Sequence, residues 1–154
     1  MSELQEGSKA PEFTGVDQNG KEISLSDFKG KKVILYFYPK DDTPGCTAQS
    51  CNLRDNYTEL INKGFEVIGV SADSVKSHKK FEEKFQLPFP LIADEDRKIV
   101  EQYSVWGEKN FMGNNYLGII RTTFLIDEEG NIKKIIVKPD TQNQTQQVLE
   151  AWEN

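Results

Sequence analysis

Cys46 and Cys51 are the two cysteines of this 154-residue chain, and they stand five positions apart. A secreted disulfide-rich domain has a higher density of cysteines in a shorter chain. A structural zinc site needs four ligands, whereas His78 is the one histidine of the chain. In a reducing compartment, two nearby thiols suggest catalysis, redox sensing or packing in the core.

The residues before Cys46 predict a helix that begins soon after a buried strand. Residues 32–38 form a nearly continuous apolar run, which is typical of a strand buried on both faces. Thr43 suits the N-cap position and Pro44 the first helical position. Cys46 then lies in the first turn, where unpaired backbone N–H groups and the helix dipole favour an anion. We therefore expect a nucleophilic thiolate at the sheet edge where open α/β folds bind ligands.

Helical geometry separates the two cysteines. At about 100° and 1.5 Å per residue, Cys51 lies roughly 140° around the helix and about 7.5 Å along it from Cys46. With a Cα radius of about 2.3 Å, the two Cα atoms are about 8.6 Å apart, beyond the roughly 7 Å that a disulfide can bridge. Cys46 shares the apolar face with Leu53, whereas Cys51 shares the polar face with Arg54. A disulfide between them requires the first turns of the helix to unwind.

The spacing of the cysteines alone leaves several functions open. CxxxxC is a weak signal, and the CxxC spacing of thioredoxin-type enzymes is absent. The two residues could be inert small hydrophobic side chains, the active site of a general thiol-disulfide oxidoreductase, or a redox sensor that switches a docking surface. Replacing Cys46 distinguishes turnover from switching.

Hydrophobic periodicity predicts an α/β fold, with a mixed sheet covered by helices. We expect a hairpin in which residues 13–16 and 21–25 flank Asn19-Gly20. The other expected strands are residues 32–38, 65–70, 121–126 and 132–137. The expected helices are residues 44–60, 75–85, 97–103 and 141–152. No linker or repeat divides the chain, so residues 1–154 are expected to form one domain.

Residues 106–118 match none of these elements. They combine Asn and Gly with aromatic residues, and they lie just before the strand that carries Arg121. We expect a loop here, either packed on the surface or placed beside a substrate or partner, because loops of this length are often functional.

Charge and hydropathy exclude two classes of partner. The chain has 19 basic and 25 acidic residues, a net charge of −6, and its short lysine pairs form no stripe that could bind a phosphate backbone. The longest uninterrupted apolar run, residues 33–38, is far short of the roughly 20 residues that span a bilayer. The first six residues lack the basic and apolar parts of a signal peptide. We therefore expect a cytoplasmic protein that binds neither nucleic acid nor membrane.

Several polar residues near these elements are assigned no chemistry. His78 shares a helical stripe with Val75 and Phe81, which predicts a hydrogen-bonded histidine at the core boundary. Asp41 and Asp42 are expected to be solvated loop charges, since acids beside Cys46 would oppose a thiolate.

A longer pattern surrounds the first cysteine. Pro39, Thr43 and Cys46 form the spacing PxxxTxxC, and Cys51 follows five positions later. This pattern resembles the active-site motif of peroxiredoxins, and with Cys51 it is similar to their Q-type subfamily, also called bacterioferritin-comigratory proteins. The resemblance continues in order through residues 69–74, 87–89 and 121–127, so it covers nearly the whole chain.

The resemblance implies a thioredoxin-like fold and a thiol-dependent peroxidase that reduces hydrogen peroxide and organic hydroperoxides. Cys46 would be the peroxidatic thiolate and Cys51 the resolving thiol, and a thioredoxin-like reductant would reopen the intramolecular disulfide between them. Thr43 would hydrogen-bond the peroxide, Arg121 would support the thiolate and the developing negative charge, and Pro39 would shield Cys46 from water.

These implied roles agree with the chemistry of O–O cleavage. The reaction needs a thiolate in line with the bond and donors aimed at both oxygens. One guanidinium can contact a thiolate and an oxyanion together through its fork of donors. The resemblance implies no metal and no organic cofactor, and it favours a monomer.

Overall fold

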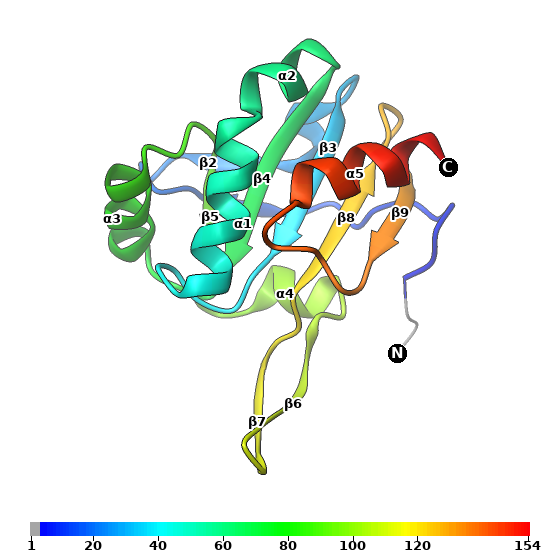
Figure 1. Cartoon of the computed structure of the whole chain (residues 1–154). Coiled ribbons are helices and arrows are strands. Elements are labelled where there is room, and N and C mark those ends of the chain that lie inside the picture. Colours follow the sequence, from blue (N-terminus) through cyan, green and yellow to red (C-terminus); the bar gives the residue numbers. More distant parts are fainter. Residues whose placement is uncertain (1–3) are drawn as a thin grey trace.

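The computed structural model describes residues 4–154, which are built around a five-stranded sheet (Figure 1). The strand order is β5 (Leu91–Ala93), β4 (Phe65–Ser71), β3 (Lys32–Phe37), β8 (Thr122–Ile126) and β9 (Ile132–Ile136). β3 is parallel to β4 and antiparallel to β8, so the sheet is mixed, as predicted. β5 is parallel to β4, and β9 is antiparallel to β8. The apolar run at β3 therefore occupies the middle of the sheet.

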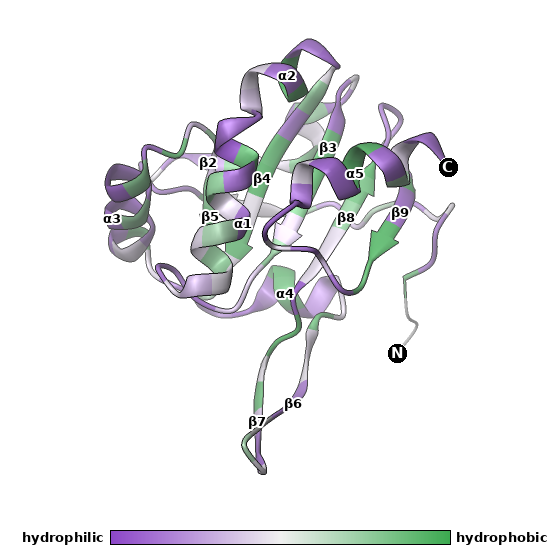
Figure 2. Ribbon diagram, in the orientation of Figure 1, coloured by the Kyte–Doolittle hydropathy of each residue, from purple (hydrophilic) through white to green (hydrophobic). Residues whose placement is uncertain are grey.

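Alternate side chains of β3 enter two different hydrophobic cores, one on each face of the sheet. Ile34 and Tyr36 pack with residues of α1 (Pro44–Asp55), α2 (Tyr57–Asn62), α3 (Val75–Phe85) and α5 (Gln144–Glu153). Val33, Leu35 and Phe37 pack on the other face with α4 (Lys98–Gln102) and the hairpin of β1 (Thr14–Val16) and β2 (Glu22–Ser24). Figure 2 shows the hydrophobic residues along the central strands and hydrophilic residues on the outer sides of the helices.

The predicted elements are present with small shifts of their bounds, and one expected helix is divided. The segment from Cys46 to Leu60 is interrupted at Asn56, whose φ of −111° and ψ of 13° depart from helical values. The Asn56 side chain donates a hydrogen bond of 2.8 Å to the carbonyl of Asn52, which is how asparagine competes with helical backbone bonds. Strand β5 and the 3-10 helix η1 (Leu25–Phe28) were not predicted, because such short elements give little periodic signal.

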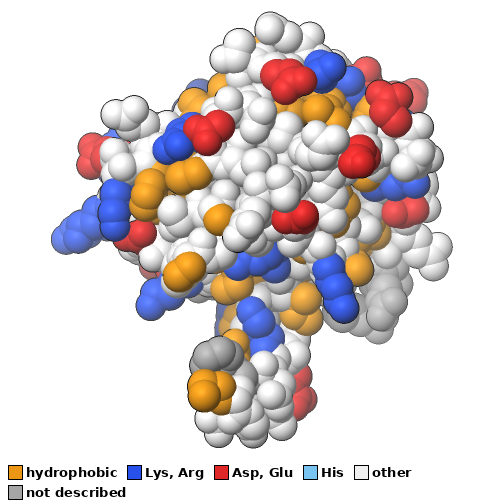
Figure 3. All heavy atoms as spheres, viewed as in Figure 1, with side chains coloured by type: hydrophobic (Ala, Val, Ile, Leu, Met, Phe, Trp, Pro, Cys, Tyr) orange, Lys and Arg blue, Asp and Glu red, His pale blue; other side chains and the backbone are white. Residues whose placement is uncertain are grey.

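The prediction of a loop at residues 106–118 is wrong. β6 (Trp106–Phe111) and β7 (Asn114–Ile119) form an antiparallel hairpin around Met112 and Gly113, which both have positive φ, as tight hairpin turns require. Figures 1 and 3 show this hairpin standing out from the body of the molecule. Its residues are mostly exposed, so they lack the apolar alternation from which a strand is recognised.

Within the described part of the chain, no helix has the length and apolar character needed to cross a membrane. The expectation about the first six residues falls partly on residues 1–3, which lie outside the described residues.

Candidate active site

Cys46 lies in the first turn of α1, as the sequence predicted. Thr43 immediately precedes the helix in an extended conformation, and Pro44 is its first residue. The Thr43 hydroxyl does not cap the helix: it donates a hydrogen bond of 2.9 Å to the Lys40 carbonyl. The Cys46 side chain is completely buried at the end of β3, among the residues of the core that contains Tyr36.

Arg121 contacts the thiol of Cys46 although the two residues are 75 positions apart. Its Nη2 donates to the Cys46 Sγ at 3.2 Å, and its Nη1 donates to the Gln49 Oε1 at 2.8 Å. Arg121 lies between β7 and β8 rather than within the expected strand, so its side chain can cross to the start of α1. A Cβ at Gly45 would stand 3.1 Å from Nη2, so the absence of a side chain there gives the guanidinium its room.

A buried polar network behind Arg121 was not predicted. The Gln49 Nε2 donates to the Gln144 Oε1 at 2.9 Å, and the Thr123 hydroxyl donates to the same oxygen at 2.6 Å. These three side chains are buried, and they join α1, α5 and β8 around the guanidinium. Gln144 lies within the expected helix of residues 141–152, but its partners belong to α1 and β8, so no local pattern identified it as part of this network.

Cys51 lies farther along the same intact helix and is partly exposed. Both cysteines are free thiols, in agreement with the predicted separation of apolar and polar faces. Burial raises the pKa of Cys51, and the Arg54 guanidinium partly opposes this effect. The residues on either side of Cys51 are held by other elements: Ser50 hydrogen-bonds Tyr36, and the Asn52 Oδ1 accepts from the Thr145 backbone N–H.

Lys109 of β6 extends its side chain to the base of the β6–β7 hairpin, where it interacts electrostatically with the site. Its Nζ donates to the Ile119 carbonyl at 3.0 Å, two residues before Arg121. Burial lowers the pKa of Lys109, the neighbouring Arg121 lowers it further, and Cys46 acts in the opposite direction. Sequence reasoning missed Lys109 because it sits in a segment without recognisable strand alternation.

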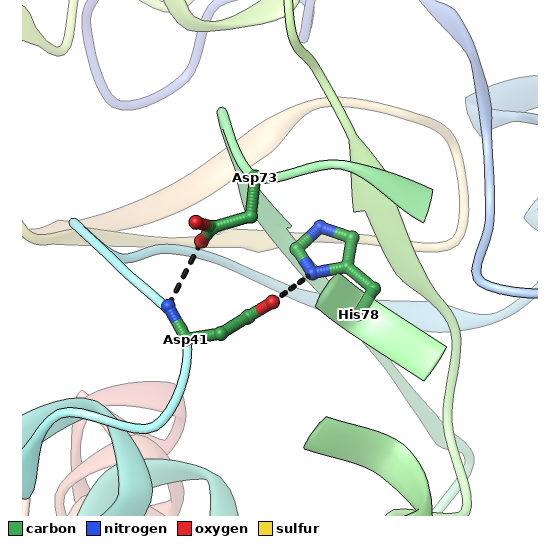
Figure 4. Close-up of side chains that lie close together, drawn as sticks. All are labelled: Asp41, Asp73 and His78. Atoms are coloured by element: carbon green, nitrogen blue, oxygen red, sulfur yellow. Dashed lines mark hydrogen bonds and ion pairs between the residues drawn. The ribbon is translucent and has the colours of Figure 1, made fainter. Parts of the chain in front are cut away.

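The loop between β3 and α1 differs from expectation at one of its two aspartates. Pro39 is half-buried two residues after the end of β3. Asp42 is exposed and pairs with Lys84 at 2.7 Å, as a surface charge would. Asp41, in contrast, is buried and lies 2.7 Å from the Nδ1 of His78 (Figure 4). His78 is itself fully buried rather than at the core boundary. Both errors have one cause: these residues satisfy each other across 37 positions of sequence.

Among the described residues, Asp41, Asp73 and His78 also form the one group whose potential metal-ligand atoms lie within 4.8 Å of one another. Each atom already has a hydrogen-bond partner: the Asp73 Oδ2 accepts from the Asp41 backbone N–H at 2.8 Å and from the Ser71 hydroxyl at 2.6 Å. The group is therefore better described as a complete hydrogen-bonded network than as a cation site.

Comparison with known proteins agrees with this geometry. The model of the AhpC/TSA family matches residues 7–135. The chain belongs to the AhpC/TSA family. Among the relatives of this family member, the putative peroxiredoxin bcp of Coxiella burnetii is 54% identical over 132 residues, covering 86% of this chain and 87% of the relative. The peroxiredoxin Bcp of Escherichia coli K12 is 47% identical over 149 residues, covering 97% of this chain and 96% of that protein.

Solved structures of similar proteins share the fold. A cysteine-to-serine mutant of PrxQ from Xylella fastidiosa superimposes with a TM-score of 0.91 at 29% identity, covering 99% of this chain and 98% of that one. The bacterioferritin comigratory protein of Xanthomonas campestris gives 0.85 at 35% identity, covering 92% and 90%. These similarities confirm the predicted thioredoxin-like peroxiredoxin fold and identify the chain as a thiol-dependent peroxidase, which implies a peroxide substrate and a thiol reductant.

Proposed function

We propose that the chain reduces hydrogen peroxide and organic hydroperoxides with Cys46 as the attacking thiolate. The observation that carries this proposal is the 3.2 Å contact between the Arg121 Nη2 and the Cys46 Sγ at the first turn of α1. A guanidinium in this position stabilises the thiolate and turns one of its donors toward the oxygen on which negative charge develops. The Xanthomonas relative, whose title names an alkyl peroxide reduction activity, supports the inclusion of organic hydroperoxides.

In the first half-reaction, the Cys46 thiolate attacks one peroxide oxygen and the O–O bond breaks. The other oxygen takes a proton and leaves as water or an alcohol, and Cys46 becomes a sulfenic acid. Because the Thr43 hydroxyl donates its proton to the Lys40 carbonyl, its oxygen is free to accept a hydrogen bond from the O–H of the peroxide. Pro39, half-buried beside this turn, would limit the access of water.

In the second half-reaction, the Cys51 thiolate attacks the sulfur of the Cys46 sulfenic acid, the S–O bond breaks, and the oxygen leaves as hydroxide, which takes a proton from solvent to become water. The product is an intramolecular disulfide, which a thioredoxin-like dithiol reduces by thiol-disulfide exchange. Since an intact α1 holds the Cα atoms about 8.6 Å apart, the first turns must unwind before the sulfur–sulfur bond can form.

The experiment is a thiol count on the fully reduced chain. One equivalent of hydrogen peroxide is added, and free thiols are counted within seconds after a denaturing quench. We expect both thiols to disappear in a chain that stays monomeric, and Cys46→Ser to keep its remaining thiol. If both thiols of the parent survive minutes of exposure, the chain is not a peroxidase of this kind, and disulfide exchange or redox sensing takes precedence.

We further propose that the chain acts in the cytoplasm as a one-domain monomer that binds no nucleic acid. The net charge of −6 supports the last point, and Figure 3 shows acidic and basic side chains intermixed on the face in view. Size-exclusion chromatography with light scattering on the reduced and oxidised chain tests the monomer, and a second subunit in either state would contradict it.

A further inference from the structure

The loop that leads to Cys46 is tied to the body of the molecule through Asp41. The Tyr38 hydroxyl donates to the Asp41 Oδ1 at 2.6 Å, and the Ser77 hydroxyl donates to its Oδ2 at 2.8 Å. The same Oδ2 lies 2.7 Å from the Nδ1 of His78, as Figure 4 shows. Asp41 therefore connects the loop to α3 as well as to the end of β3.

The partners of His78 determine its protonation. Its Nε2 lies 2.9 Å from the Ile92 carbonyl oxygen, which can only accept, so Nε2 carries a proton. Its Nδ1 faces a carboxyl oxygen at 2.7 Å, and two bare acceptors cannot approach so closely, so a second proton lies between Nδ1 and Asp41. Two hydroxyls also donate to the Asp41 carboxyl group, one to each oxygen, so both oxygens act as acceptors. The second proton therefore belongs to the ring, which makes His78 a buried imidazolium.

We propose that His78 is a positioning residue for the peroxidatic reaction, which holds Asp41 and thereby fixes the upstream end of the segment that carries Cys46. This inference rests on the proposed function of Cys46. His78 does not touch the reacting atoms; it acts through Asp41, five residues before the thiol.

The attachments on either side of Cys46 show why one upstream anchor matters. Downstream, Gln49 is bonded to Arg121 and Gln144, and Asn52 to α5. Upstream, the buried anchor is Asp41, and the next residue, Asp42, has a left-handed φ of 58°. The segment between these anchors, residues 42–48, contains the turn that must unwind for the disulfide to form. An anchored upstream end lets this segment return to one geometry around Cys46 after each cycle.

The first test measures the ring directly and does not depend on activity. Because His78 is the one histidine, ¹⁵N-histidine labelling gives the signals of this ring alone. In the reduced chain at pH 7 we expect both nitrogens to be protonated. A spectrum with one protonated and one bare ring nitrogen would overturn the assignment of the imidazolium.

The second test replaces the carboxylate of Asp41 by a neutral amide that can form the same hydrogen bonds. In Asp41→Asn, the two amide protons can reach a neutral Nδ1 and the Ser77 oxygen, while the amide oxygen accepts from Tyr38. We expect this variant to keep most of the rate of Cys46 oxidation and to show a bare Nδ1 in the ¹⁵N spectrum. Asp41→Ala, which removes all three bonds, should lose the rate.

The third test removes the hydrogen bond between the histidine ring and Asp41 and keeps the bond to the Ile92 carbonyl. His78→Gln can still donate to the Ile92 carbonyl, but it has no group at the position of Nδ1. We expect its second-order rate constant with hydrogen peroxide to fall about tenfold or more, as small misplacements of reacting groups do. We also expect alkylation of Cys46 by iodoacetamide to become faster, because the loop no longer holds the thiol in the core.

Tyr103→Phe is the matched control, since it removes one hydrogen bond, to the Pro11 carbonyl, in the core on the opposite face of the sheet. It should leave the peroxide rate unchanged. The positioning role is overturned if His78→Gln matches the parent in peroxide rate, or if both of its rates fall together. If the parent itself does not consume peroxide, the proposed function fails while the ¹⁵N result stands.

Discussion

The two cysteines of α1 are held in different ways. At the N-terminal end, Cys46 is completely buried, and its thiol accepts a hydrogen bond from a distant part of the chain, the Arg121 guanidinium. Toward the middle, Cys51 is partly exposed, and its neighbours Ser50 and Asn52 are bonded to β3 and α5. The backbone at Cys51 is therefore fastened, whereas the turn at Cys46 lies between anchors.

This difference indicates which thiol would move in the proposed cycle. In that cycle Cys46 would react first, in its buried position beside Arg121, and would afterwards have to reach Cys51. Unwinding the first turn breaks few tertiary bonds, whereas unwinding at Cys51 would also break those of Ser50 and Asn52. We infer that the peroxidatic end of α1 travels and the resolving end stays in place.

The largest expected effect comes from replacing each cysteine in turn, because the two substitutions should stop the reaction at different steps. Cys46→Ser should abolish peroxide consumption, because of the two described thiols only Cys46 is hydrogen-bonded by a guanidinium, that of Arg121. Cys51→Ser should still react once and then accumulate a sulfenic acid, since the resolving thiol is gone. Trapping with dimedone and mass spectrometry measures this difference. Continued turnover by Cys51→Ser with a thioredoxin-like reductant would remove the need for a resolving cysteine.

The next largest effect concerns the contact that sets Cys46 apart. Arg121→Leu removes both the donor to the thiol and the donor to Gln49, so the rate constant for peroxide should fall by about 10²–10³-fold. Stopped-flow measurement of the first half-reaction checks this value. Arg121→Lys keeps the charge but loses the fork of donors, and it should restore only part of the rate. Full activity in Arg121→Lys would show that charge alone is sufficient.

A smaller effect is expected at Gly45. The new methyl group of Gly45→Ala would stand 3.1 Å from the Arg121 Nη2, so the guanidinium has to shift by a few tenths of an ångström. We expect a drop in the peroxide rate of about tenfold, with little change in the midpoint of thermal unfolding. Gly30→Ala is a useful reference for a glycine substitution outside the site. Gly30 precedes the start of β3, whereas Cys46 follows its end, and the positive φ of Gly30 should make the change costly for stability and not for the peroxide rate.

The smallest effect is a pH dependence at Cys51. Because burial raises its pKa, Cys51 holds less thiolate near neutral pH than the same cysteine in the unfolded chain. In Cys46→Ser, alkylation by iodoacetamide should therefore be slower in the folded than in the urea-unfolded protein at pH 8. The two rates should converge as the pH rises through the folded pKa. Equal rates at pH 8 would mean that burial does not restrain the resolving thiol.

Local sequence patterns predicted the elements that carry the cysteines. The apolar run of β3, the Thr43-Pro44 helix start and the 3.6-residue period of α1 each depend on neighbouring residues, so they could be recognised without a fold. The faces of α1 followed in the same way, which is why one cysteine was expected inside and the other near the surface. The break at Asn56 was not predicted, because it depends on one hydrogen bond from a side chain to the backbone.

Residues whose environment comes from distant segments were predicted poorly. Asp41 appeared to be a solvated loop charge because its partner His78 lies in another helix. Gln144 was predicted only as part of the helix of residues 141–152, yet it completes the network behind Arg121. The β6–β7 hairpin was missed because a strand pair that stands away from the core has no buried face to impose alternation on its sequence.

The sequence by itself determined that a thiol stands at the start of a helix after a buried strand, and that a second thiol on the same helix is out of its reach. These properties follow from backbone geometry over a few turns. The family resemblance implied a role for Arg121, but only the tertiary structure showed that its guanidinium contacts the first thiol, that Gln49 and Gln144 support it, and that His78 holds the loop through Asp41. Those contacts arise when segments far apart in sequence are packed together, because hydrogen bonds between buried groups form where the fold brings donor and acceptor within about 3 Å.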